Sequence, residues 1–296
     1  MSVPPPSYAH PGPPPEHPER PEGAPERSRR SGLPPWRWWM GVLGVVLGLA
    51  IPLVLGVLAG VGVALTGDSG DELPSGVLIV LTFLQDIGFV AAALFVARMA
   101  RRPTARDFGL VRTAFWRAVG ITLAVYAAFY VFAGIWAALL DIDEESDLPD
   151  ELGADSSTVA LVAVIVLVCV MAPVAEEFLF RGLLFTSIRA SAGMWPAAIV
   201  TGLVFGGIHV GSSPVGLLVP LAILGVGLCL IYAWTRSLYP CVALHAINNA
   251  IAFGVTQDWT WEIPLLAVGG TAVSLLIVVG IARALGRQGA GRVVTA

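Results

Sequence analysis

The sequence contains no lysine and few charged residues of any kind. All 17 of its basic residues are arginine, and the four charged residue types together make up 13% of the 296 residues. Average proteins carry about 25% charged residues, whereas hydrophobic residues here reach 56%. This composition excludes an ordinary water-soluble domain and indicates a membrane protein.

Cysteine is also scarce. Cys169, Cys229 and Cys241 are widely spaced, and each lies in an apolar stretch. Disulfide frameworks and cysteine zinc sites use closely spaced cysteines, so the pattern favours neither. We expect the three thiols to be small buried side chains.

Aliphatic residues are almost absent from the first 35 residues, which are rich in proline, glutamate and arginine. Such a segment cannot bury enough apolar surface to offset the conformational entropy that folding costs. We therefore expect residues 1–35 to form a disordered tail. A cleaved signal peptide would place its apolar stretch near the start of the chain, so the first apolar run is expected to be a retained membrane anchor.

Long apolar runs with short connections fill the rest of the chain. The first run follows Trp36, Trp38 and Trp39, and aromatic clusters of this kind mark the membrane interface. We predict an all-α polytopic membrane protein with about eight transmembrane helices, in one transmembrane domain at 36–285, followed by a short cytoplasmic tail at 286–296. The expected segments are residues 40–65, 76–97, 115–140, 158–171, 195–209, 215–233, 238–253 and 263–281.

Arginine occupies alternate connections between these segments, and the remaining connections are acidic, above all residues 141–155. Because cytoplasmic loops carry an excess of positive charge, we expect both termini and every arginine-bearing loop to be cytoplasmic. The exclusive use of arginine and the richness in Ala, Gly and Val indicate a GC-rich coding sequence. This favours a bacterial plasma membrane over an endoplasmic reticulum.

Two adjacent carboxylates follow a proline in one of the apolar runs. Pro173 removes a backbone donor, and the helical pattern resumes at Glu176, Glu177 and Arg181. On a helix Glu177 and Arg181 are four residues apart and share a face, whereas Glu176 points about 100° away. We expect Glu177 and Arg181 to form a structural ion pair, which leaves Glu176 free to face a cavity.

Two further polar pairs have the same four-residue spacing on later runs. Phe205 and His209 share one helical face, with two glycines between them that permit close helix approach, and His245 and Asn249 share another. Polar groups in hydrocarbon are costly unless they are paired or functional. Three helices can therefore bring these side chains and Glu176 to one polar pocket, with Phe205 in a supporting role.

Gln85 and Asp86 interrupt the second apolar run. Asp86 could pair with an arginine, line a cavity or react. We favour a structural polar contact over a catalytic role.

The motifs Glu-Glu-x-x-x-Arg, Phe-x-x-x-His and His-x-x-x-Asn occur in that order on successive apolar segments. Together they resemble the CAAX prenyl endopeptidase and bacteriocin-processing family, called CPBP or Abi, over about residues 158–254. The resemblance implies an intramembrane endopeptidase of eight helices. It further implies that Glu176 and His209 activate the hydrolytic water, while His245 and Asn249 stabilise the oxyanion.

A metal site is the alternative chemistry. Glu176, His209 and His245 could supply three ligands and leave a fourth position open, as catalytic zinc sites do. The sequence lacks a His-Glu-x-x-His pattern, and Asn249 is a poor zinc ligand. We favour hydrolysis without a cofactor and keep zinc as the alternative.

Two other functions remain open: a non-proteolytic immunity or scaffold protein of the same fold, and a proton-coupled transporter. Transporters often contain internal repeats with matching broken helices, and none is visible here. For a protease we expect a membrane-associated or lipidated protein or peptide as substrate, the lipid bilayer as its surroundings and no nucleic acid as partner. Whether the substrate is prenylated, and the oligomeric state, are not indicated.

Overall fold

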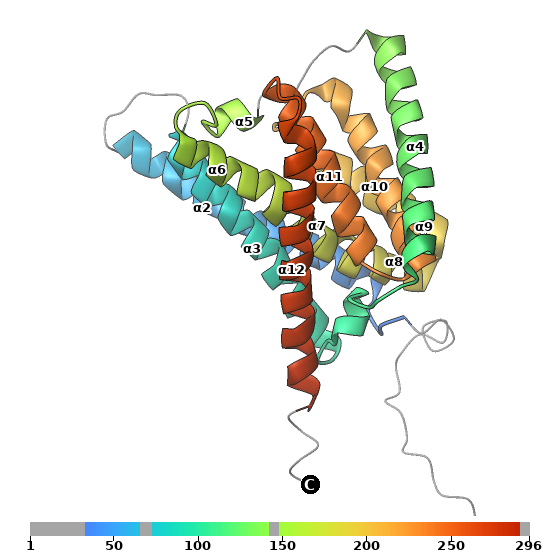
Figure 1. Ribbon diagram of the computed structural model, residues 1–296. Coiled ribbons are helices and arrows are strands. Elements are labelled where there is room, and N and C mark those ends of the chain that lie inside the picture. The colour runs from blue at the N-terminus through green and yellow to red at the C-terminus, as the bar shows by residue number, and fades with distance from the viewer. Residues whose placement is uncertain (1–32, 66–72, 142–147, 291–296) are drawn as a thin grey trace, which may run out of the picture.

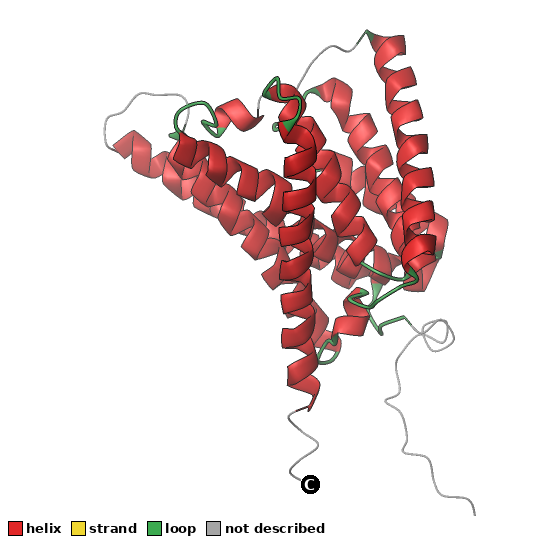
Figure 2. Ribbon diagram, viewed as in Figure 1, coloured by secondary structure: helices red, strands yellow, loops and turns green. Residues whose placement is uncertain are grey.

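The computed structural model describes residues 33–65, 73–141 and 148–290, with side chains up to residue 286. Within these ranges every regular element is a helix, apart from an isolated β-bridge between Val210 and Ser213 (Figure 2). The predicted all-α class is therefore confirmed. The elements are α2 (Trp38–Leu65), α3 (Ser75–Ala100), η1 (Ala105–Phe108), α4 (Phe115–Leu140), α5 (Leu148–Glu151), α6 (Thr158–Val166), η2 (Leu167–Met171), α7 (Ala172–Glu177), η3 (Phe178–Phe185), α8 (Thr186–Ala192), α9 (Met194–Gly207), α10 (Val215–Thr235), α11 (Tyr239–Thr256) and α12 (Glu262–Ala290).

Six helices in the described part of the chain are long and apolar enough to cross a membrane. They are α2, α3, α4, the continuous run from α6 to α8, α10 and α12. All eight predicted segments fall on helices, but α9 has only 14 residues. Helix α11 has 18 residues, including a histidine and two asparagines, and is not among the six. The expected count of eight spans is not confirmed.

The outer faces of the helices are apolar, as a membrane requires. Leu53 and Leu58 on α2 and Leu123 and Leu139 on α4 are all more than 60% exposed. Soluble monomers rarely expose contiguous apolar faces of this size, so these surfaces belong against lipid and the protein is an integral membrane protein. Figure 1 shows α2 and α3 side by side, crossing α12 obliquely, while α4 runs along α10.

The predicted segment at 158–171 is wrong at its C-terminal end. The helical run that starts at Thr158 continues to Ala192 and contains two π-helical stretches, η2 and η3. In η2 the N–H of Ala172 bonds to the carbonyl of Leu167, five residues back. Pro173 explains this wider turn, because proline has no N–H to donate to a carbonyl of the preceding turn.

This long run is the centre of the molecule. Every residue from Pro173 to Phe185 is buried. Phe178 stacks on Phe108 of η1 with ring centroids 4.1 Å apart, and Phe180 meets Phe89 of α3 edge to face. The two carboxylates of α7 therefore lie deep in the helical packing.

Helix α9 is held against α10 by glycines. A Cβ on Gly202 would come within 2.6 Å of the carbonyl oxygen of Ala222, and one on Gly206 within 2.7 Å of that of Leu218. A Cβ on Gly207 would meet nothing within 4 Å. Close approach thus depends on Gly206 but not on Gly207, and it sets the position of the α9 end that carries His209.

Candidate active site

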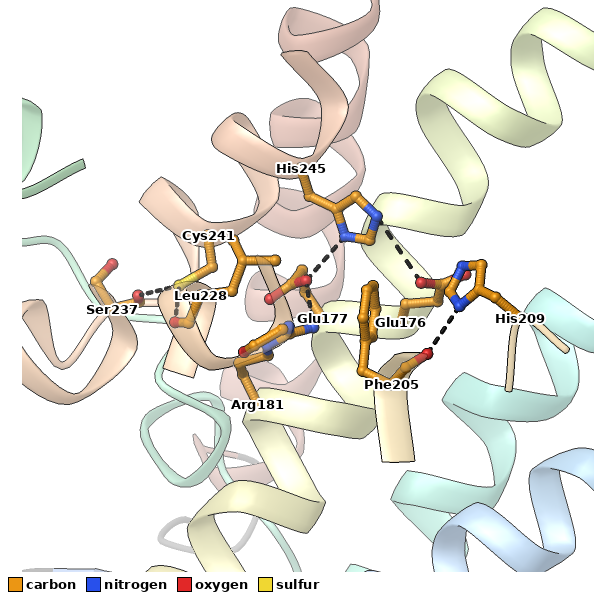
Figure 3. Close-up of polar contacts among 10 residues, drawn as sticks. Glu176, Glu177, Arg181, Phe205, His209, Leu228, Ser237, Cys241 and His245 are labelled. Carbon is orange, nitrogen blue, oxygen red and sulfur yellow. Dashed lines mark hydrogen bonds and ion pairs between the residues drawn. The ribbon is translucent and has the colours of Figure 1, made fainter. Parts of the chain in front are cut away.

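Glu177 is fully buried and has two polar partners. Its Oε1 accepts a hydrogen bond from Nη1 of Arg181 at 2.7 Å and lies 2.8 Å from Nδ1 of His245 (Figure 3). Since a carboxylate only accepts, Nδ1 of His245 carries the proton. The four-residue spacing predicts the contact with Arg181. No spacing predicts the contact with His245, which lies 68 residues further along the chain.

Glu176 lies on the other side of the His245 ring from Glu177, near the second ring nitrogen. Its Oε2 lies 3.8 Å from Nε2 of His245, which is too long for a direct hydrogen bond. This oxygen has no hydrogen-bond partner within the described residues, although Glu176 is only 7% exposed. Oε2 of Glu177 is also without a hydrogen-bond partner in the described chain. The two adjacent carboxylates differ in their other contacts: Oε1 of Glu177 holds Arg181 and His245, whereas Glu176 faces an imidazole nitrogen with an oxygen that nothing else engages.

The ring of Phe205 connects the polar residues. Its centroid lies 5.1 Å from the ring of His209 and 5.6 Å from that of His245. The guanidinium carbon of Arg181 lies over the same ring, 4.6 Å from its centroid. Phe205 thus sets the spacing between the two histidines and covers the buried cation, a favourable cation–π arrangement.

His209 lies just beyond the end of α9, which stops at Gly207 rather than at the predicted residue 209. Its Nδ1 is 2.7 Å from the carbonyl oxygen of Phe205. A carbonyl only accepts, so Nδ1 is the protonated nitrogen and Nε2 is available as an acceptor. Within the described residues no hydrogen bond joins His209 to Glu176.

Asn249 bonds to the backbone of the carboxylate-bearing run. Its Nδ2 donates to the carbonyl of Val168 at 2.9 Å. In the π-helical register that carbonyl would accept from residue 173, which is a proline and has no N–H. One amide hydrogen of Asn249 therefore replaces the missing backbone donor, a role that sequence spacing does not reveal.

A cavity of about 400 Å³ lies between α4, α10 and α11. His209 and Asn249 line it, but Glu176 and His245 do not. This cavity therefore brings together two of the four expected side chains. The other walls are largely apolar, with contributions from Phe129, Trp136, Leu217, Leu221, Leu224 and Phe253.

Asp86 brings a third carboxyl group to this region. It is 1% exposed, its Oδ2 has no hydrogen-bond partner in the described part of the chain, and it is within electrostatic range of Glu176. No salt bridge joins Asp86 to an arginine in that part. Arg181 thus compensates only one of three buried carboxyl groups. Because unpaired charge is costly away from water, protons on the carboxyl groups or on His245 must balance the remaining negative charge.

The three-ligand metal set is not assembled. Among the residues that the structure describes, no group of three or more His, Cys, Asp or Glu side chains is arranged to hold a metal ion. Nδ1 of His209 and Nδ1 of His245 face protein acceptors, which leaves Nε2 of each ring available as a ligand. Glu176, His209 and His245 are thus not gathered around one point in this arrangement, and zinc stays the alternative chemistry.

Comparison with known protein families matches the same part of the chain to one family. Residues 158–251 match the model of the family described as type II CAAX prenyl endopeptidase Rce1-like. Searches of curated proteins and of solved structures gave no significant match. The matched range extends from α6 into α11, and the resemblance predicted from the motifs is confirmed over it. It includes Glu176, Glu177, Arg181, Phe205, His209, His245 and Asn249.

Proposed function

We propose that this protein is an intramembrane endopeptidase that hydrolyses a peptide bond in a membrane-associated or lipidated protein or peptide. The observation that carries the proposal is the free, buried Oε2 of Glu176 facing Nε2 of His245 at 3.8 Å. A desolvated carboxylate beside an imidazole is suited to proton transfer. It lies within the residues that match a CAAX-type protease family.

Glu176 is the general base in this mechanism. Its carboxylate takes a proton from a water molecule as the water oxygen attacks the scissile carbonyl carbon, and the electrons of the carbonyl π bond move to the oxygen. Collapse of this tetrahedral intermediate breaks the C–N bond, and the proton held by Glu176 passes to the leaving amine. His209 orients the water through its free Nε2.

His245 and Asn249 stabilise the negative oxygen of the intermediate. Nδ1–H of His245 is directed to Glu177, so donation from Nε2 requires the imidazolium form. Charge balance favours that form: with Asp86 neutral, two carboxylates face two cations, Arg181 and His245. The second amide hydrogen of Asn249 is the other donor.

The substrate brings an apolar chain to this site. The cavity of about 400 Å³ beside His209 and Asn249 is walled by aromatic and aliphatic side chains from three helices. Such a cavity favours a hydrophobic ligand and excludes a free polar peptide. A lipidated or membrane-embedded segment satisfies this requirement and is delivered from the bilayer.

The arginine distribution supports a single orientation for the enzyme. With both termini cytoplasmic, the loop after α3, the α8–α9 junction and the end of α12 all belong to the inner side of a bacterial plasma membrane. In Figure 1 these parts lie in the lower half of the molecule.

Cleavage by the purified full-length protein tests the proposal. The protein is reconstituted in nanodiscs and assayed against lipidated and membrane-anchored fluorogenic peptides, alongside Glu176→Gln. Glu151→Gln, on the exposed surface of α5, is the matched control. We expect cleavage by the wild type and the control, and its abolition by Glu176→Gln.

A strong chelator separates the two chemistries in the same assay. Full activity after chelation supports the carboxylate mechanism, whereas inactivation that zinc reverses overturns it in favour of a metal enzyme. Cleavage by Glu176→Gln at the wild-type rate overturns the assignment of the base. Absence of cleavage across the whole substrate set, with proton flux or partner binding in its place, favours a transporter or a scaffold.

A further inference from the structure

A second and larger cavity, of about 720 Å³, lies where three connections meet. These are the segment that follows α3, the junction of α8 with α9 and the junction of α10 with α11. None of the three carboxyl groups of the candidate active site lines this cavity. Its walls include four arginines: Arg106, Arg112, Arg189 and Arg236.

Among the described residues, the positive charge of this cavity has no uncommitted counterion. Asp107 is the single acidic wall residue in that part of the chain, and both carboxylate oxygens of Asp107 are already engaged. One is paired with Arg101, which is not a wall residue, and the other accepts from the backbone and hydroxyl of Thr104. Within the described residues none of the four cavity arginines forms a salt bridge.

Three of the four arginines, Arg106, Arg112 and Arg236, are exposed. Arg189 and Arg236 are nevertheless close enough to repel each other. Arg189 is half-buried, with its guanidinium carbon 5.7 Å from the ring centroid of Phe185. Arg236 ends α10 with φ of 56°, a left-handed conformation that glycine or asparagine usually adopts.

Another part of the wall is closely packed and carries hydroxyl groups. Tyr232 is 6% exposed and lines the cavity together with Thr186. Gly109 approaches the tyrosine so closely that a Cβ there would lie 2.6 Å from the phenolic oxygen. Gly109 also has φ of 69°, so a side chain at this position is disfavoured by both contact and backbone. The hydroxyl of Thr186 donates to the carbonyl of Arg181 at 2.9 Å. The cavity thus combines cationic groups with the phenol of Tyr232 on a packed frame.

We propose that this cavity binds an anionic phosphate group, carried by a lipid headgroup or by a soluble phosphorylated compound. Guanidinium groups match phosphate oxygens with paired, charge-assisted hydrogen bonds. A carboxylate needs one arginine for such a pair, whereas four unpaired arginines suit a phosphate group with its higher charge and three or more oxygens. The positive-inside rule explains arginine on this side of the membrane, but not its convergence from separate connections on one cavity.

Binding measurements with defined phosphate probes test the site. The full-length protein in phosphatidylcholine nanodiscs is titrated with short-chain phosphatidic acid and, separately, with glycerol 3-phosphate and inorganic phosphate. The cavity variant is Arg189→Gln/Arg236→Gln. The control, Arg98→Gln/Arg117→Gln, removes the same charge from exposed residues near the same end of the protein that do not line the cavity.

We expect the wild type and the control to bind phosphatidic acid with similar affinity, and the cavity variant at least about tenfold more weakly. Saturation by phosphatidic acid alone identifies a lipid headgroup, whereas equal binding of glycerol 3-phosphate or phosphate identifies a soluble ligand. Thermal unfolding without ligand verifies that the cavity variant is folded, and Arg189→Lys/Arg236→Lys keeps the charge if it is not. No binding of any probe, or equal weakening in the control, overturns the proposal.

Discussion

Nδ1 of His245 lies 2.8 Å from Oε1 of Glu177, the same oxygen that accepts a hydrogen bond from Arg181. The second glutamate of the Glu-Glu motif therefore orients His245 on α11. It also neutralises Arg181, which lies on the same helical run as the glutamate. This contact sets the ring so that Nε2 faces Glu176. Glu177 is thus a positioning residue for the proposed chemistry.

Glu177→Gln is expected to destabilise the protein strongly. The change leaves Arg181 buried without a counterion, and breaking a buried ion pair by removing one partner costs about 3–5 kcal/mol. Thermal unfolding in detergent measures the loss. Replacing both partners, in Glu177→Leu/Arg181→Met, should cost less than Glu177→Gln alone, and a larger cost for the double variant would contradict the ion-pair account.

Asp86→Asn, in contrast, is expected to lower the free energy of unfolding by less than about 1 kcal/mol. Asp86 is buried without a salt bridge in the described chain and lies near Glu176, so we infer that it is protonated. An amide then replaces a neutral carboxyl of the same shape. Unfolding of Asp86→Asn and Glu177→Gln under identical conditions compares the two. Equal destabilisation would show that Asp86 carries a charge that the protein needs.

Asn249→Ala is expected to lose both stability and rate. Removing the amide leaves the carbonyl of Val168 without its donor, which costs about 1–3 kcal/mol. Loss of an oxyanion donor lowers the hydrolysis rate by about 10² to 10³. Gln257→Ala, just beyond α11 and outside the cavity walls, is the control, because in the described chain its side chain makes only a long contact of 3.5 Å to the carbonyl of Thr256.

A double-mutant cycle with Pro173→Ala isolates the structural part of this effect. Alanine restores an N–H that can serve the preceding turn, so the stability cost of Asn249→Ala should be smaller in the Pro173→Ala background. The rate loss should remain. An unchanged stability cost would mean that Asn249 does not replace the missing proline donor.

Gly206→Ala and Gly207→Ala should behave differently although the residues are adjacent. A methyl group at residue 206 would lie 2.7 Å from the carbonyl oxygen of Leu218, whereas at residue 207 it meets nothing. Overpacking of this kind costs about 1–3 kcal/mol and moves the helix end that carries His209. Unfolding and hydrolysis assays should show losses for Gly206→Ala alone. Similar losses at both positions would contradict the α9–α10 contact.

The sequence predicts the helical segments well because apolar length and arginine placement are local properties. It misplaces the end of the run that begins at Thr158, since a continuous helix with π-helical turns has the same hydrophobic pattern as two separate helices. It also treats α9 as a span, although 14 residues are too few to cross the hydrocarbon core as a straight helix. Periodicity reveals a helix but not its route through the membrane.

The sequence by itself determined the membrane class, the resemblance to a CAAX-type protease and the contact between Glu177 and Arg181, because four residues on one helix are always neighbours. Only the tertiary structure decided that His245 meets Glu177, that Asn249 serves the carbonyl of Val168 and that Asp86 approaches Glu176. Those contacts join different helices, and their formation depends on how far each helix is rotated and displaced against its neighbours. Packing of side chains across the whole interior sets these quantities, and no local spacing encodes them.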